Sequence, residues 1–113
     1  MTARKVEAHF FTATILEWKY LLRPTKYKDI VLDCLKYLVD GGRVKVIGFV
    51  IMDNHIHLLW HICDGHKAEK VQQSFLKYTA QQIKADLSLN HPLVLEHFRV
   101  DASDRIYQFW ERN

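Results

Sequence analysis

The sequence predicts an α+β fold in which two helices cover one face of a four-stranded antiparallel sheet. The 113 residues are enough for one domain, with 49% apolar residues. Apolar residues recur at helical spacing in two stretches, whereas β-branched and aromatic runs predict strands in four others. The resulting order is βαββαβ. Right-handed crossovers close this order into the ferredoxin-like arrangement, which leaves the second face of the sheet without helices.

A strand and a helix make up the first third of the chain. Residues 6–16 (VEAHFFTATIL) are rich in β-branched and aromatic side chains, which predicts a strand. Thr25 is predicted as the N-cap of the first helix, and Gly41–Gly42 is predicted to end it. The apolar residues at helical spacing are Tyr27, Ile30, Val31, Cys34, Leu35 and Leu38.

A hairpin follows the first helix. Residues 43–52 and 55–63 predict two antiparallel strands, and Asp53–Asn54 between them suits a tight turn because both residues tolerate left-handed backbone. Residues 67–87 then predict a long amphipathic helix. After one short helical turn at 93–98, residues 106–111 (IYQFWE) predict the fourth strand.

The composition is that of a globular domain and argues against a membrane-spanning or disulfide-rich protein. Charged residues make up 26% of the chain, which is ordinary for a globular domain, and no apolar run reaches the length of roughly 18 residues that a membrane span needs. Cys34 and Cys63 have neither disulfide-framework nor zinc-ligand spacing, so a reducing cytoplasm is expected. The net charge of +3 gives only a weak preference for polyanions.

The third predicted strand carries the sequence's main functional signal. Side chains alternate between the two faces of a strand, so the apolar residues of this strand share the core face. His55, His57 and His61 then lie on the helix-free face. The core-face residues are Ile56, Leu58 and Trp60.

The spacing of the three histidines predicts a metal site formed by His55 and His57. At about 3.3 Å per residue, His55 and His57 lie about 6.6 Å apart along the strand, close enough for both imidazoles to bind one cation. His61 lies about 13 Å beyond His57 and is too distant to share that ion. Two alternatives remain open: the histidines are polar residues of a half-exposed sheet, or they belong to a zinc enzyme, although no further ligands stand at zinc-binding spacing.

Several segments together resemble the HUH (His–hydrophobic–His) single-tyrosine transposases, which include small insertion-sequence and REP-associated tyrosine transposases. The resemblance extends over nearly the whole chain, in order and spacing. Its segments are HFFTATI, FVIMDNHIHLLWHI, QQSFLKYTAQQIK and DRIYQFWERN. The family's fold is the βαββαβ sheet that the pattern of elements predicts independently.

The resemblance implies an enzyme that cleaves and rejoins single-stranded or hairpin DNA. In that family two histidines hold Mg²⁺ or Mn²⁺, and a tyrosine attacks the phosphate to form a 5′-phosphotyrosine link. Carried over to this chain, the metal ligands are His55 and His57. Two neutral imidazoles suit this role because they leave the ion's charge available to the phosphate, although imidazole ordinarily prefers Mn²⁺ to Mg²⁺.

This chain departs from the family pattern at two places. Asp53 stands where many members have proline, which is expected to alter only the turn. The family's nucleophilic tyrosine lies on a helix after the fourth strand, with a polar third metal ligand one turn later, and we expect that helix to lie outside these 113 residues. Tyr78 and Tyr107 are weaker candidates for the nucleophile: Tyr78 is expected on the helix-covered face and Tyr107 on the last strand.

Residues that could contact DNA are harder to assign. Basic residues expected to flank the sheet are Arg4, Lys5, Lys45 and Arg112, and aromatic candidates for base stacking are Phe11, Phe109 and Trp110. Solvated charges and core aromatics explain each of these equally well. The stripe formed by Lys70, Lys77 and Lys84 is expected to be the solvent face of the long helix.

Three functional hypotheses follow. The first is a metal-dependent DNA-processing domain of the transposase type, without its tyrosine helix. The second is a non-catalytic module that binds hairpin or single-stranded DNA. The third is a small α+β interaction domain whose histidines have no metal-binding role. A homodimer is possible under the first hypothesis, since the family contains both dimers and proteins that act alone.

Overall fold

The structure is a computed structural model that describes residues 7–112. The elements are β1 (His9–Thr14), η1 (Leu16–Trp18), α1 (Thr25–Asp40), β2 (Val44–Ile51), β3 (His55–Ile62), α2 (Ala68–Asn90), α3 (Pro92–Glu96), β4 (Arg99–Ala102) and β5 (Arg105–Tyr107). The predicted α+β class is confirmed. None of the helices in residues 7–112 is both long and apolar enough to cross a membrane.

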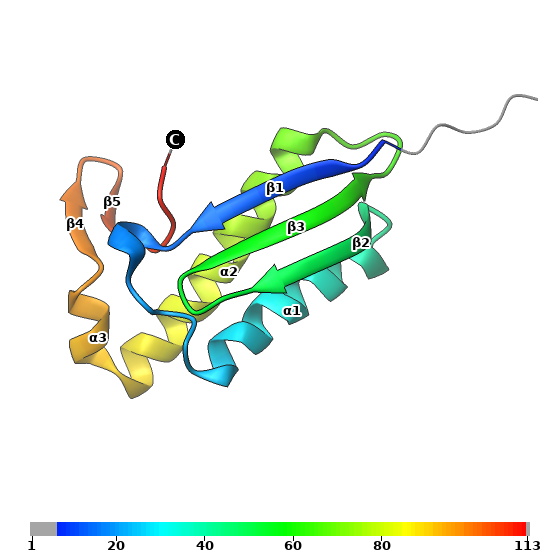
Figure 1. Ribbon diagram of the computed structural model, residues 1–113. Helices are drawn as coiled ribbons and strands as arrows, with labels where there is room; N and C mark the ends of the chain where they lie inside the picture. Colours follow the sequence, from blue (N-terminus) through cyan, green and yellow to red (C-terminus); the bar gives the residue numbers. More distant parts are fainter. Residues whose placement is uncertain (1–6, 113) are drawn as a thin grey trace, which may run out of the picture.

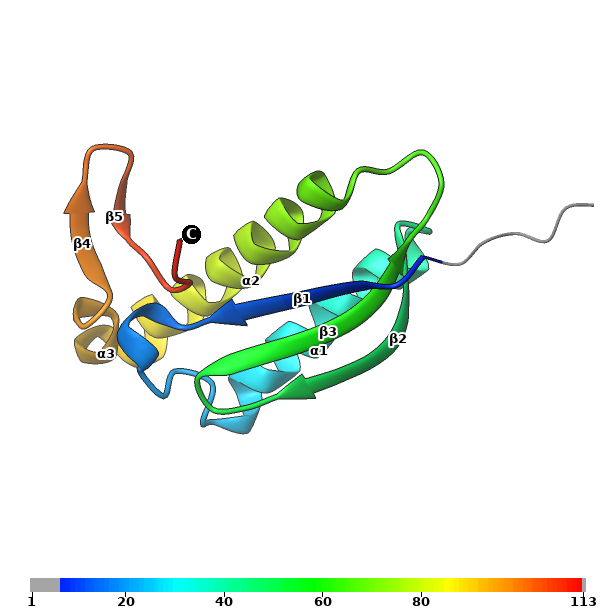
Figure 2. The same cartoon turned by 45° about the horizontal axis from the view of Figure 1, so that its top comes forward.

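β1, β3 and β2 form the main sheet, in that spatial order and with antiparallel pairing throughout. The register places Thr12 beside His57 on one side of β3 and Val50 beside His57 on the other. The two long helices, α1 and α2, lie on the same side of this sheet (Figures 1 and 2). The opposite face carries neither of them, as the sequence predicted.

The core lies between β3 and the two helices. Ile56, Leu58 and Trp60 are fully buried. The indole of Trp60 stacks on Phe11 with ring centroids 5.7 Å apart and meets Phe75 of α2 edge-on at 6.0 Å. These contacts join β1, β3 and α2 in a single layer of packed aromatic side chains.

α1 presents the predicted apolar stripe to this core. Its buried residues are Tyr27, Val31, Cys34, Leu35 and Leu38. The predicted cap is wrong by one residue: Pro24, with an extended backbone, is the N-cap residue, and no side chain caps the helix. Proline fixes φ near the value that a helix start requires, so Thr25 already lies inside the first turn. Burial raises the pKa of the Cys34 thiol to about 12, which keeps this thiol protonated.

A polar cluster joins the two long helices at their exposed edge. The carboxylate of Asp86 on α2 accepts hydrogen bonds from the Tyr27 hydroxyl at 2.6 Å and from Asn90 at 2.8 Å. Lys26 lies 2.8 Å from the same carboxylate. Hydrogen bonds from Lys26 and then Tyr27 lower the pKa of Asp86 to about 2, whereas burial and the Asp86 carboxylate raise the pKa of Tyr27.

The predicted fourth strand of the main sheet is replaced by a different arrangement. Residues 106–111 are predicted to form the fourth strand of one sheet, but Arg105–Tyr107 pairs instead with β4 in a separate two-stranded sheet. Within residues 7–112, the C-terminal segment joins the main sheet through a single antiparallel bridge, between Trp110 and Ile15. The main sheet of the described chain therefore has three strands.

Local packing explains why the terminal segment does not form one continuous strand. Phe98 and Phe109 pack with ring centroids 5.3 Å apart, and the Gln108 amide donates to the Phe98 carbonyl at 2.9 Å. These contacts hold the chain against its own hairpin until residue 109. Trp110 then turns into the core, where its indole N–H donates to the Thr79 hydroxyl at 3.1 Å.

The division of β3 into a buried and an open face predicts unequal costs for two neighbouring truncations. Leu58→Ala creates a cavity in the core and should lower the free energy of unfolding by about 2–5 kcal/mol. Leu59→Ala removes the same atoms from the open face and should cost less than half as much. Urea denaturation of both variants measures the difference, and equal losses would contradict the assignment of the two faces.

Candidate functional site

His55 and His57 lie side by side on the face of the sheet opposite the helices. Their burial alternates with that of the core residues, since both histidines are half-buried while Ile56 between them is fully buried. The two imidazole centroids are 5.0 Å apart, with their planes at 79°. β3 therefore brings the two rings together as predicted. His61, on the same face, instead has Nδ1 3.0 Å from the Glu7 carbonyl oxygen.

Each imidazole of this pair has a hydrogen-bond partner at Nδ1. His55 Nδ1 lies 2.8 Å from the Asn54 side-chain oxygen, and the amide nitrogen of Asn54 donates to the Trp18 carbonyl at 3.3 Å. That second bond fixes the amide orientation, so the Asn54 oxygen accepts and His55 Nδ1 donates. His57 Nδ1 lies 3.0 Å from the Thr12 hydroxyl. The Nε2 lone pair of His55 is therefore available to a ligand.

The turn before His55 is held by charged side chains from the first third of the chain. Lys28 of α1 donates to the Asp53 carboxylate at 2.8 Å, and Arg23 lies 3.4 Å from it. The hydrogen bond from Lys28 is the largest cause of a lowered pKa at Asp53. Asp53 is thus more than a residue that suits the turn, because it ties the start of β3 to α1.

Two exposed aromatic side chains flank the histidine pair, and the sequence interpretation missed both. Phe10 of β1 is 69% exposed and stacks on His57 with centroids 5.6 Å apart. Trp18 is 60% exposed and meets His55 edge-on at 5.9 Å. Alternation along β1 could have placed Phe10 on this face, since Phe10 and Thr12 are two residues apart. No sequence pattern indicated Trp18.

An unusual backbone conformation presents Trp18 to His55. Glu17 and Trp18 both have left-handed backbone, with φ of 55° and 57°. Two hydrogen bonds hold this turn: the Glu17 amide donates to the Glu111 carboxylate at 2.6 Å, and the Trp18 amide donates to the Ile15 carbonyl at 2.9 Å. Such a conformation costs roughly 1–2 kcal/mol per non-glycine residue, so these contacts must offset it.

The aromatic residues predicted to stack on bases belong mostly to the core. Phe109 and Trp110 are buried, so the stacking role predicted for these two is wrong. Phe11 is half-buried and its ring stacks on Trp60. Among the basic candidates, Lys45 is exposed and Arg112 lies 3.4 Å from Asp104. Arg4 and Lys5 lie outside the described residues.

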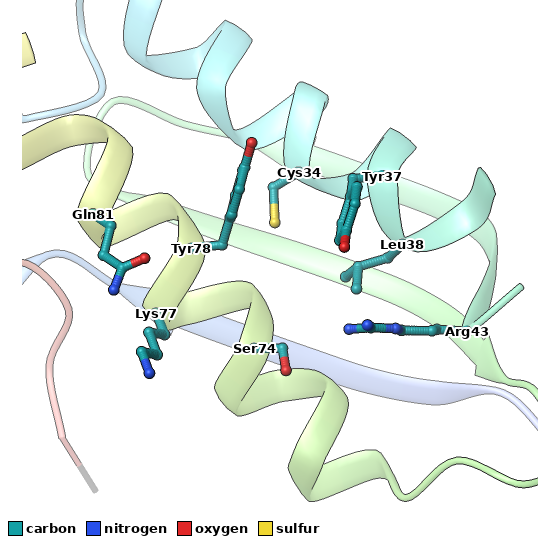
Figure 3. A pocket seen from close by; sticks show the side chains of 8 residues that line it. All are labelled: Cys34, Tyr37, Leu38, Arg43, Ser74, Lys77, Tyr78 and Gln81. Atoms are coloured by element: carbon teal, nitrogen blue, oxygen red, sulfur yellow. The ribbon is translucent and has the colours of Figure 1, made fainter. Parts of the chain in front are cut away.

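Neither candidate tyrosine contacts the histidine pair. Tyr78 lies between the two long helices, where its ring stacks on Tyr37 of α1 with centroids 5.8 Å apart (Figure 3). The two rings line a small pocket of about 210 Å³ together with Arg43 and Ser74. Tyr107 lies on β5, and its hydroxyl donates to Glu96 at 3.2 Å.

In the part of the chain that the structure describes, the histidine pair has no third protein ligand of the usual kinds. Among residues 7–112, no group of three or more histidine, cysteine, aspartate or glutamate side chains converges on one point. The polar neighbours of the pair are the Thr12 hydroxyl and the Asn54 amide. The site thus consists of two imidazoles, their two hydrogen-bond partners, and the flanking Phe10 and Trp18.

Comparison with known proteins identifies related folds. No family model and no curated protein sequence matches the chain. The structure is similar to that of a candidate transposase from Deinococcus radiodurans R1, with a TM-score of 0.62 and 12% identity over 86% of this chain and 72% of that one. It is also similar to a REP-associated tyrosine transposase bound to a REP hairpin, with a TM-score of 0.59 and 13% identity. That match covers all of this chain and 58% of the other, and at these identities it shows a shared fold.

Proposed function

We propose that this chain is a DNA-binding domain of the HUH transposase type, which binds a divalent metal through His55 and His57 and takes single-stranded or hairpin DNA on the histidine face. The similarity to two transposase folds supports the type of domain. The observation that carries the proposal is the paired imidazoles on a helix-free sheet face, with their centroids 5.0 Å apart.

The hydrogen bonds at Nδ1 support a metal role for both rings. A histidine that binds a metal through one nitrogen commonly donates its other N–H to an oxygen, which fixes the tautomer and orients the ring. Asn54 accepts such a bond from His55, and the Thr12 hydroxyl can accept one from His57. In that state Nε2 of each ring is unprotonated and free to bind.

The donor set fits a six-coordinate divalent ion of the Mn²⁺ or Mg²⁺ class. Two imidazoles leave most coordination positions to water and to phosphate oxygens, and imidazole favours Mn²⁺ over Mg²⁺. Such an ion, when bound, offsets negative charge on a DNA phosphate. His55 and His57 would hold it, while Thr12 and Asn54 keep the two rings in place.

Phe10 and Trp18 give the histidine face two surfaces on which unpaired bases can stack. Both are more than half exposed, and each contacts one ring of the histidine pair. Aromatic side chains contribute about 1–3 kcal/mol per stacked base without requiring a particular sequence. Their position on either side of the pair suits a single strand whose phosphate lies over the two histidines.

The positions of Tyr78 and Tyr107 favour a domain that binds DNA without cleaving it. Cleavage needs a nucleophile about 3–3.5 Å from the phosphate. The Tyr78 ring is packed against Tyr37 on the helical side, and the Tyr107 hydroxyl is bound to Glu96. Strand cleavage at the histidine pair would require a tyrosine other than Tyr78 and Tyr107.

Mn²⁺ titration tests the metal site. Wild-type protein should bind Mn²⁺, and His57→Ala should abolish most of this binding because one of two ligands is lost. Thr12→Val should weaken it about tenfold by removing the partner of Nδ1. Isothermal titration calorimetry measures each effect.

His61→Ala is the matched control for this titration. His61 lies on the same strand and face but is bound to the Glu7 carbonyl. Its removal should leave the affinity for Mn²⁺ unchanged. Identical binding by the wild type and the His55→Ala/His57→Ala double variant would refute the site.

Fluorescence anisotropy with a labelled hairpin that carries a single-stranded extension tests the DNA face. Phe10→Ala and Trp18→Ala should each raise the dissociation constant by a factor of about 5–150, which corresponds to one lost stacking contact. Tyr37→Ala, which removes an aromatic side chain that is also more than half exposed but lies on the helical side, should have no effect. Affinity should fall steeply with salt. Equal losses in all three variants would show that the histidine face is not the binding surface.

A covalent assay separates binding from cleavage. The chain of residues 1–113, incubated with the same DNA and Mn²⁺, should give no SDS-resistant protein–DNA adduct, because neither Tyr78 nor Tyr107 faces the histidines. An adduct that disappears in Tyr78→Phe or in Tyr107→Phe would identify the nucleophile and contradict this expectation. Denaturing gel electrophoresis gives the result directly.

A further inference from the structure

A small pocket opens between α1 and α2, on the helical side of the sheet and away from the histidine pair (Figure 3). Its volume is about 210 Å³, below the roughly 300–1000 Å³ of pockets that hold drug-sized ligands, so it suits a small group. Within residues 7–112, none of the side chains that line it is an aspartate or a glutamate, whereas Arg43 and Lys77 are both cationic. The lining of this pocket therefore carries positive charge that no lining carboxylate balances.

Arg43 differs from the other arginines of the described chain in having no carboxylate partner. The other four arginines in residues 7–112 each form an ion pair with an aspartate or a glutamate; they are Arg23, Arg99, Arg105 and Arg112. Arg43 forms no ion pair in that range, although it is half-buried. A guanidinium group is always charged and carries five N–H donors, so partial burial without an anionic partner is costly. An anion bound in the pocket would supply that partner.

Contacts of both its backbone and its side chain hold Arg43 in place. The Arg43 amide donates to the Leu38 carbonyl at 3.0 Å, and the Arg43 carbonyl accepts from the Cys63 amide at 2.9 Å. The guanidinium lies over the Tyr37 ring, 5.7 Å from its centroid, which is within the range of a cation–π contact. Tyr37 stacks in turn on Tyr78, with the two ring planes 6° apart. Tyr78 is therefore a positioning residue for Arg43, acting through Tyr37.

Polar groups reach the pocket from three parts of the fold. Figure 3 shows the Arg43 side chain extending from the turn before β2 towards α2, with Ser74 on the α2 side and Tyr37 on the α1 side. Lys77 also lines the pocket, but its ammonium points away from Arg43 in this view. Donors that approach from different directions suit a tetrahedral oxyanion, because its oxygens diverge, whereas the two oxygens of a carboxylate lie in one plane.

We propose that this pocket binds the phosphate group of inorganic phosphate or of a small phosphate monoester, with Arg43 as its principal ligand. The planar guanidinium binds two oxygens of a phosphate group at once through parallel N–H groups. The Ser74 and Tyr37 hydroxyls would donate further hydrogen bonds, and Lys77 would add a second positive charge. A phosphate monoester carries a charge of about −1.5 to −2 at neutral pH, which these two cations would balance.

Titration of the whole chain with inorganic phosphate at constant ionic strength tests the proposal. In ¹H–¹⁵N NMR spectra the Arg43 Nε–Hε resonance should shift and reach saturation, and acetate should bind at least about tenfold more weakly. Arg43→Gln should weaken phosphate binding at least about tenfold in isothermal titration calorimetry, because charge-assisted hydrogen bonds are lost. Lys36→Gln is the matched control: it removes a charge from an exposed position of α1 outside the pocket and should leave the affinity unchanged.

Two substitutions of Tyr78 test its positioning role. Tyr78→Leu removes the ring that supports Tyr37 and should weaken phosphate binding by a factor of about 2–13, which corresponds to the loss of one aromatic pair. Tyr78→Phe keeps the ring and should bind phosphate like the wild type. The Arg43 Nε–Hε resonance of the phosphate-free protein should move in Tyr78→Leu and stay in place in Tyr78→Phe. Circular dichroism confirms that both variants fold.

Competing ligands distinguish the sources of the phosphate group. Phenyl phosphate that binds more tightly than inorganic phosphate would support a monoester, and the reverse order would support free phosphate. An oligodeoxynucleotide without terminal phosphates should not reverse the shift of the Arg43 resonance; reversal would assign the pocket to DNA and overturn the proposal. Equal phosphate affinity in the wild type and Arg43→Gln would overturn it as well, and so would equal losses in Arg43→Gln and Lys36→Gln, since these would show only a general attraction of charge.

Discussion

β3 is hydrogen-bonded along both of its edges, to β1 on one side and to β2 on the other. This double pairing fixes the alternation of its side chains, since a slip of one residue would expose Ile56, Leu58 and Trp60 and bury the histidines. The apolar face of β3 is the centre of the core that α1 and α2 cover. The same constraint holds His55 and His57 on a face with no helix above it. Folding and the candidate site therefore depend on one register.

Sequence reasoning was most successful where residues alternate regularly over several positions. The HIHLLWHI segment predicted the strand, its buried face and the common face of the histidines, and all three are confirmed. The apolar stripe of α1 was predicted equally well, because helical spacing depends on local geometry alone. Whether the histidine pair binds a metal stays a prediction, since no spacing rule distinguishes a ligand from a half-exposed polar residue.

Other features depend on contacts between distant parts of the chain, which local patterns do not encode. IYQFWE has strand-forming residues, but its first part pairs with β4 and only Trp110 forms a bridge to the segment that follows β1. Phe109 and Trp110 are buried, and this burial favours the observed arrangement over one continuous strand. Trp18 reaches His55 only through a turn that Glu111 and Asn54 support from far along the chain. The preference of Asp53 for a turn is local and could be predicted, whereas its hydrogen bond with Lys28 forms only once α1 has packed against the sheet.

The left-handed backbone of the consecutive residues Glu17 and Trp18 limits where this protein can be stabilised by substitution. Glycine at either position would relieve the backbone strain, so stability alone favours a change there. Glycine in place of Trp18 would remove the aromatic ring beside His55, and glycine in place of Glu17 would loosen the turn that presents this ring. Stabilising substitutions in this protein should therefore be chosen at other positions, so that the Trp18 ring stays beside His55.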